Sequence, residues 1–168
     1  DTHTVEVKPE HSPPVHLHGD VILIATGSYP HHPDNLPFHD QRVYDSDTIL
    51  KINDLPRSML VAGGGVIGCE YACMFAALGI EVTLVEGRDR LLTFLDSDIS
   101  EALAAAMKKL GIHVRLSDMI ETVDTAPEGF QVNLKSGDVA NVQNILAATG
   151  RSGATDRLNL SGIGIEVG

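Results

Sequence analysis

The sequence has few cysteines, no tryptophan and no long apolar run. Its 168 residues include two cysteines, three tyrosines and four phenylalanines. Two cysteines cannot build the disulfide scaffold of a small secreted protein, which favours a reducing compartment, and we expect the cytoplasm. No apolar stretch approaches the roughly 18 residues that a membrane helix needs. The chain starts with Asp1-Thr2-His3 and lacks the basic and apolar segments of a signal peptide, so we expect an internal piece of a longer, non-exported product.

Basic residues are also scarce. The chain has 12 Lys and Arg against 23 Asp and Glu, which gives a formal net charge of −11. Nucleic acids and anionic membranes are both bound through clustered cations, so neither is an expected partner. In contrast, 43% of the residues are hydrophobic and 16 residues are glycine. This composition is typical of an α/β protein with a packed core and tight turns.

Strand-like and helix-like patterns alternate after residue 57. The expected strands are residues 59–62, 82–85 and 112–116, and the expected helices are residues 66–78 and 97–110. This strand-helix-strand-helix-strand order predicts a Rossmann-like parallel sheet with right-handed crossovers. In the second helix, Ser97 is the expected N-cap, and the apolar positions fall on one face: Ile99, Leu103, Met107 and Leu110.

Further strands are expected on both sides of this unit. Three short strands at 119–125, 130–134 and 139–142 have glycine-containing links, which predicts an antiparallel β-meander. Residues 145–148 then form another buried strand. Before the unit, residues 2–7 and 15–19 alternate like edge strands, and the apolar run 21–25 predicts a strand buried on both faces.

A glycine motif lies between the first strand and the first helix of the unit. It reads Gly63-x-Gly65-x-x-Gly68, and Glu86 ends the next strand 23 positions after Gly63. In a dinucleotide fingerprint the first glycine allows the turn, the second admits the pyrophosphate and the third lets helix and strand pack. The helix N-terminus attracts the phosphates, and the acid accepts hydrogen bonds from the adenosine ribose. The alternative is a structural turn that binds nothing.

Two arginines leave the choice between NAD and NADP open. A carboxylate at Glu86 favours NAD because it repels the 2′-phosphate of NADP. Arg88, two positions later, is placed to neutralise that phosphate. The alternative is that Arg88 and Arg90 are solvated loop charges.

Several stretches share their order and spacing with one protein family. They are Ala25-Thr26-Gly27-Ser28-x-Pro30, Leu55-Pro56, Gly63-Gly64-Gly65-Val66-Ile67-Gly68-x-Glu70-x-Ala72, Glu86 and Ala148-Thr149-Gly150-Arg151. Together they resemble the pyridine nucleotide–disulfide oxidoreductase superfamily over nearly the whole chain. Within it, residues 44–50, 68–72 and 89–96 are most similar to the FAD-dependent members that pass hydride between NAD(H) and NADP(H).

This resemblance implies a division of the chain. Residues 57–148 would form the NAD(P)-binding domain, and residues 1–56 and 149–168 would be pieces of an FAD-binding domain. The parent would be an FAD-dependent oxidoreductase and a homo-oligomer. This chain alone would hold no catalytic residue and would be inactive. Two alternatives stay open: a disulfide reductase similar to lipoamide dehydrogenase, which an acid at Glu86 favours, and a dinucleotide-binding module without redox chemistry.

The resemblance also implies roles for individual residues. Glu70 would lie near the nicotinamide, and Gly150 and Arg151 would lie beside the nicotinamide and flavin. Thr26 and Gly27 would line FAD in the full-length parent. The complete implied NAD(P) set is Gly63, Gly64, Gly65, Val66, Ile67, Gly68, Glu70, Glu86, Gly87, Arg88, Gly150 and Arg151.

Other reactive side chains predict no further site. Cys69 and Cys73 are four positions apart on a helix, where Cβ atoms lie about 5–6 Å apart. A disulfide needs about 3.5–4.5 Å, so we expect two core residues. His16 and His18 share one face of a strand, but no further ligand spacing completes a metal site, and none is expected.

Overall fold

The computed structural model describes residues 2–166 and divides the chain into two compact units. One unit comprises residues 30–151, and the other takes the described residues on either side of that range. Residues 1, 167 and 168, at the ends of the predicted flanking segments, lie outside the described residues. No helix among residues 2–166 is long and apolar enough to cross a membrane.

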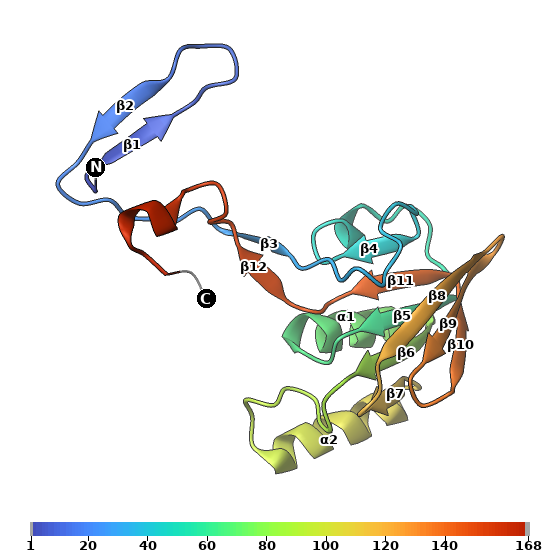
Figure 1. The fold of residues 1–168 in the computed structure, drawn as a ribbon. Helices are drawn as coiled ribbons and strands as arrows, with labels where there is room; N and C mark the ends of the chain where they lie inside the picture. Colours follow the sequence, from blue (N-terminus) through green and yellow to red (C-terminus); the bar gives the residue numbers. More distant parts are fainter. Residues whose placement is uncertain (1, 167–168) are drawn as a thin grey trace. The chain divides into compact units, whose positions relative to one another are not determined.

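The larger unit is built on a five-stranded parallel sheet (Figure 1). Its strand order is β4-β11-β5-β6-β7, and every neighbouring pair is parallel. The strands are β4 (Val43–Asp45), β5 (Ser58–Ala62), β6 (Glu81–Glu86), β7 (His113–Leu116) and β11 (Asn144–Ala147), and the crossover helices are α1 (Val66–Ala77) and α2 (Ser97–Lys109). The predicted α/β class with a Rossmann-like order is confirmed.

Strand β4 belongs to the same parallel sheet although it precedes residue 57. It pairs in parallel with β11 through the register Val43 to Ile145. The compact unit comprises residues 30–151 and so contains the whole predicted range 57–148, whose assignment as the NAD(P)-binding domain stays a prediction. A strand of only three residues, such as β4, is too short to show a periodic pattern.

The predicted three-stranded antiparallel meander is confirmed, and the structure places it over one face of the sheet. It consists of β8 (Ile120–Ala126), β9 (Gly129–Leu134) and β10 (Val139–Val142) in the order β10-β9-β8. Alternate residues of the central strands face opposite layers. Leu60 and Ile145 pack with Phe130 and Val132 of the meander, and Val61 and its neighbours pack with the helices on the other face.

The two helices differ in how closely they follow their sequence patterns. Helix α1 ends at Ala77 and is followed by Gly79 at φ +85°, close to the predicted end. In α2 the N-cap is Asp96 rather than Ser97. Leu103 and Met107 pack on the core as predicted, but Ile99 and Leu110 are 56% and 47% exposed while Ser100 is buried. Small Ala104 packs against the same core as Leu103 and Met107.

The smaller unit holds a short hairpin of β1 (Thr4–Val7) and β2 (Val15–His18). Two further strands, β3 (Ser28–Pro30) and β12 (Arg151–Gly153), pair with each other. The 3-10 turns are η1 (Ile49–Lys51) in the larger unit and η2 (Leu160–Ile163) in the smaller one. The predicted buried strand at 21–25 is wrong, because Val21 and Leu23 are 88% and 87% exposed. No described strand pairs with this run, and a strand buried on both faces needs such neighbours.

Candidate functional site

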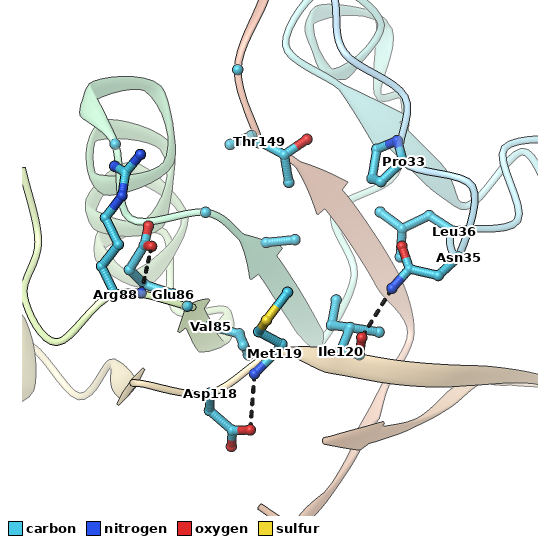
Figure 2. A pocket seen from close by; sticks show the side chains of 16 residues that line it. Pro33, Asn35, Leu36, Val85, Glu86, Arg88, Asp118, Met119, Ile120 and Thr149 are labelled. Carbon is cyan, nitrogen blue, oxygen red and sulfur yellow. Dashed lines mark hydrogen bonds between the residues drawn. The ribbon is translucent and has the colours of Figure 1, made fainter. Parts of the chain in front are cut away.

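A pocket of about 570 Å³ opens at the carboxyl edge of the parallel sheet (Figure 2). Ligand sites of open α/β sheets lie at this edge. Six of the sequence-predicted site residues line it: Gly63, Gly65, Glu86, Gly87, Arg88 and Gly150. The residues therefore come from the ends of β5, β6 and β11, which the chain order keeps far apart but the sheet brings together.

Two glycines of the motif are needed by the fold itself. Gly63 has φ +110°, and a Cβ there would lie 2.4 Å from the Ala148 carbonyl oxygen. A Cβ on Gly68 would lie 1.9 Å from the Gly63 carbonyl oxygen. Both contacts are with backbone, so no side-chain rotation relieves them. The turn, the start of α1 and the end of β11 consequently pack at a distance that only glycine permits.

Gly65 differs from its two neighbours in the motif. It is the N-cap of α1, with φ −77° and ψ −173°, and a Cβ there would meet nothing within 4 Å. It lines the pocket, and the first turn of α1 contains no acidic side chain. The first backbone N–H groups of a helix have no partner inside the helix and carry its positive dipole end. This corner of the pocket is therefore suited to a phosphate.

Glu86 braces the glycine turn. Its Oε2 accepts a hydrogen bond from the Gly64 N–H at 2.6 Å, and its Oε1 accepts one from the Arg88 N–H at 2.9 Å. The sequence predicted only contact with a ribose. A carboxylate has about four acceptor positions, so both oxygens keep capacity for ribose hydroxyls. Glu86 thus links the turn, the following loop and the pocket.

The two loop arginines have different surroundings. Arg88 lines the pocket beside Glu86, and its Nη1 lies 3.5 Å from Thr93 Oγ1. Arg90 does not line the pocket, and its Nη2 donates to the Thr93 carbonyl oxygen at 3.4 Å. Arg88 is therefore the arginine placed to meet a charged group in the pocket.

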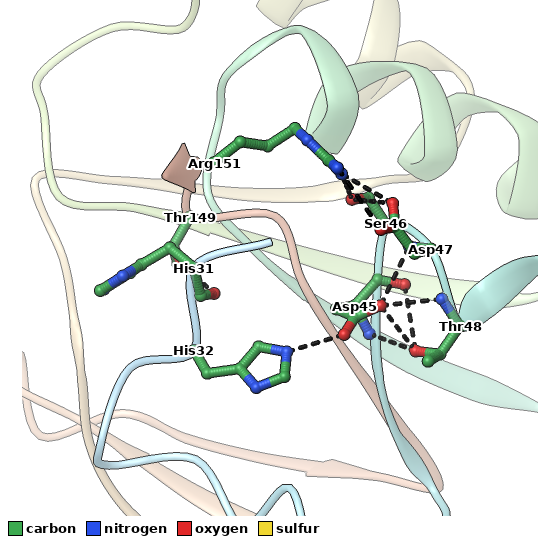
Figure 3. A network of polar contacts seen from close by, with 8 residues as sticks. All are labelled: His31, His32, Asp45, Ser46, Asp47, Thr48, Thr149 and Arg151. Atoms are coloured by element: carbon green, nitrogen blue, oxygen red, sulfur yellow. Dashed lines mark hydrogen bonds and ion pairs between the residues drawn. The ribbon is translucent and has the colours of Figure 1, made fainter. Parts of the chain in front are cut away.

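The remaining predicted residues do not line the pocket: Gly64, Val66, Ile67, Gly68, Glu70 and Arg151. Glu70 is exposed on α1. Arg151 Nη1 donates to Asp47 Oδ1 at 2.7 Å and to Ser46 Oγ at 2.9 Å (Figure 3). This hydrogen-bonded ion pair raises the pKa of Arg151 and lowers the pKa of Asp47. Thr26 and Gly27 belong to the smaller unit, so their predicted contact with FAD stays a prediction.

Ten lining residues were not predicted from the sequence: Pro33, Asn35, Leu36, Ala62, Val85, Asp118, Met119, Ile120, Ala148 and Thr149. In Figure 2 the 33–36 segment faces Glu86 and Arg88 across the pocket. Residues 118–120 follow β7, and the rule that loops after parallel strands line the site would have found them. The 33–36 segment has no regular structure and carried no such signal.

Burial and hydrogen bonds shift the pKa values of Asp118 and Cys69 near the site. Burial alone would raise the pKa of Asp118, but hydrogen bonds from Ser136 and the Met119 N–H outweigh it and lower that pKa. Cys69 and Cys73 are free thiols, and burial raises the pKa of Cys69 to about 11. Within the described part of the chain, no group of His, Cys, Asp or Glu side chains is arranged to hold a metal ion.

The chain matches known proteins over its whole length. A family model described as pyridine nucleotide-disulphide oxidoreductase matches residues 1–168. Soluble pyridine nucleotide transhydrogenases are 42% identical over 166 residues in Vibrio atlanticus and 46% identical over 167 residues in Pseudomonas putida. Each alignment covers 99% of this chain but 36% of the relative, so the chain spans about a third of their length.

Solved structures give the same result for the fold. The HOCl-induced flavoprotein disulfide reductase RclA from Escherichia coli is 31% identical and superposes with a TM-score of 0.84, covering 99% of this chain and 37% of that one. LpdA from Mycobacterium tuberculosis is 26% identical with a TM-score of 0.86, covering 99% of this chain and 36% of that one.

Proposed function

The chain belongs to the pyridine nucleotide-disulphide oxidoreductase family, and we propose that it is the dinucleotide-binding part of an FAD-dependent soluble pyridine nucleotide transhydrogenase. The parent would act in the cytoplasm as a homo-oligomer. The segments on either side of residues 30–151 are the candidates for its FAD domain. FAD, when bound there, would take hydride from one nicotinamide and deliver it to another.

The pocket at the sheet edge is the proposed site for NAD or NADP. The observation that carries this proposal is the open space at Gly65, beside the N-terminus of α1 and inside the pocket. A pyrophosphate there would accept hydrogen bonds from backbone N–H groups of the turn. The ribose of the adenosine would lie against Glu86, and Thr149 and Gly150 would lie towards the nicotinamide.

Calorimetric titration of NAD⁺ into the wild-type chain and Gly65→Val tests this site. The valine places a branched side chain where the pyrophosphate would lie, so binding should become too weak to measure. Gly153→Val is the matched control, because a Cβ added there also clashes with no atom of the chain and Gly153 does not line the pocket. Equal affinity of wild type and Gly65→Val would refute the site.

A disulfide reductase is the second candidate. It is favoured by the likeness to RclA and by the acid at Glu86, which suits NAD rather than NADP. Cys69 is unsuited to be its reactive thiol, because it is buried and burial raises its pKa to about 11. Such a reductase would need a Cys-x4-Cys pair in the gene upstream of residue 1. Sequencing that region distinguishes the two candidates.

A further inference from the structure

One wall of the pocket is an irregular segment. Pro33, Asn35 and Leu36 line the pocket between β3 and β4, where there is no helix or strand to hold them. Leu36 is buried in the cluster under the meander, and Asn35 Nδ2 donates to the Ile120 carbonyl oxygen at 2.9 Å. These contacts hold Asn35 and Leu36 in place, and other contacts hold the residues on either side of the wall.

His32 anchors both ends of this wall. Its Nε2 lies 2.7 Å from Asp45 Oδ2 (Figure 3), and its ring stacks on Phe38 with 3.9 Å between ring centroids and 14° between ring planes. His32 immediately precedes the wall and Phe38 follows it. The stacked rings therefore close a loop around residues 33–36, and the bond to Asp45 ties this loop to the end of β4.

Asp45 is a fixed partner for this histidine. It is buried, and its Oδ1 accepts hydrogen bonds from the Asp47 N–H, the Thr48 N–H and Thr48 Oγ1, at 2.8 to 3.0 Å. Burial alone would raise its pKa, but the hydrogen bonds from His32 and Thr48 outweigh burial and lower the pKa to about 2. The group is thus a carboxylate at neutral pH and only accepts, so His32 Nε2 donates.

The same segment also contacts the neighbouring wall formed by residues 149 and 150. The His31 N–H donates to the Gly150 carbonyl oxygen at 2.9 Å, and Thr149 Oγ1 donates to the His31 carbonyl oxygen at 3.4 Å. Thr149 and Gly150 both line the pocket. Residues 31 and 32 therefore join the 33–36 wall to the 149–150 wall.

We propose that His32 is a positioning residue of the dinucleotide site: its hydrogen bond to Asp45 sets the 33–36 wall against the 149–150 wall and so controls affinity for the dinucleotide. This rests on the proposed function. His32 itself is not among the residues that line the pocket, so it acts through the wall it anchors.

Two substitutions separate the hydrogen bond from the ring contact. H32F keeps a ring to stack on Phe38 but cannot donate to Asp45, and it should weaken NAD⁺ binding about tenfold, or 1.4 kcal/mol. H32Q loses the ring but keeps an amide donor for Asp45, and it should stay within about threefold of wild type. His39→Phe is the matched control, an exposed histidine of the same segment. All four chains are titrated with NAD⁺ by calorimetry well below their melting temperatures.

The outcomes decide between positioning and a purely structural role. Weak binding by H32F with recovery in H32Q supports the proposal. Equal affinity of H32F and wild type overturns it, even where H32F melts at a lower temperature. If H32F does not fold, the NAD⁺ affinity of H32Q decides. H32Q keeps the hydrogen-bond donor, so a loss of affinity above tenfold in a folded H32Q would show that the hydrogen bond is not the controlling contact. If the wild type binds no NAD⁺, the proposed function fails, and this inference fails with it.

Discussion

An added methyl group should destabilise the protein strongly at Gly68 and only slightly at Gly65. An alanine Cβ at Gly68 would lie 1.9 Å from the Gly63 carbonyl oxygen, whereas one at Gly65 would meet nothing within 4 Å. Ordinary contacts of a Cβ begin near 3.4 Å. Gly68→Ala therefore requires α1 to move away from the turn by more than an ångström, because the obstructing atom is backbone.

The cost follows from what α1 holds in place. Cys69, Ala72 and Phe75 are buried on its inner face, so moving the helix opens contacts along the whole core. Overpacking of this kind costs about 1–3 kcal/mol and sometimes more, and we expect at least 2 kcal/mol for Gly68→Ala. At Gly65 the poorer N-cap of alanine costs about 1 kcal/mol, and the reduced freedom of the unfolded chain returns about 0.4–1 kcal/mol. The net change at Gly65 should stay within about 1 kcal/mol.

Urea unfolding followed by far-UV circular dichroism measures both values. Wild type, Gly68→Ala and Gly65→Ala are compared through their midpoints at equal slopes, since a changed slope would indicate a changed unfolded or native state. An unfolding free energy of Gly68→Ala within 1 kcal/mol of wild type would refute the close packing of turn and helix. Equal destabilisation by both substitutions would refute the distinction between the two glycines.

Three further predictions concern charged groups. Arg88→Ala should weaken NADP⁺ binding more than NAD⁺ binding. Glu86→Ala should weaken NAD⁺ binding about tenfold or more, since charge-assisted hydrogen bonds contribute about 1.5–3 kcal/mol. Both variants are titrated with both ligands by calorimetry, and a variant that loses equal affinity for NAD⁺ and NADP⁺ would contradict its prediction. The pKa of Asp45 is lowered from its ordinary 3.8 to about 2, so its stabilising contribution is complete above about pH 5 and is lost as the pH falls towards 2. Wild type should lose about 2 kcal/mol more unfolding free energy than Asp45→Asn over that interval, and parallel urea-midpoint curves would show the carboxylate contributes nothing.

Local patterns predicted the parts of the fold that local contacts build. The order of strands and helices followed from apolar periodicity, and the meander followed from short glycine-containing links. The orientation of α2 was only half predicted, because Ser100 and Ala104 do not count as apolar in a periodicity argument. Ser100 is nevertheless buried, and Ala104 packs against the core.

The features that could not be predicted from the sequence depend on contacts between residues far apart in the chain. The run at 21–25 is apolar enough for a buried strand, but apolarity reports a tendency to be buried and does not supply neighbours. The 33–36 wall of the pocket is held by partners such as Asp45 and Ile120, which lie up to 85 positions away in the chain. No periodicity links such residues, so only the folded topology places them together.

The three motif glycines carry unequal evidence for a ligand. A turn between strand and helix that bound nothing would still need Gly63, for its positive φ and its approach to Ala148, and Gly68, for its approach to Gly63. It would not need Gly65, whose backbone conformation suits any residue and whose added Cβ would meet no atom of the chain. The spacing of the motif is therefore explained by packing at two positions. Only the third position, Gly65, indicates a dinucleotide, because the space that a side chain would fill there opens into the pocket beside the helix N-terminus.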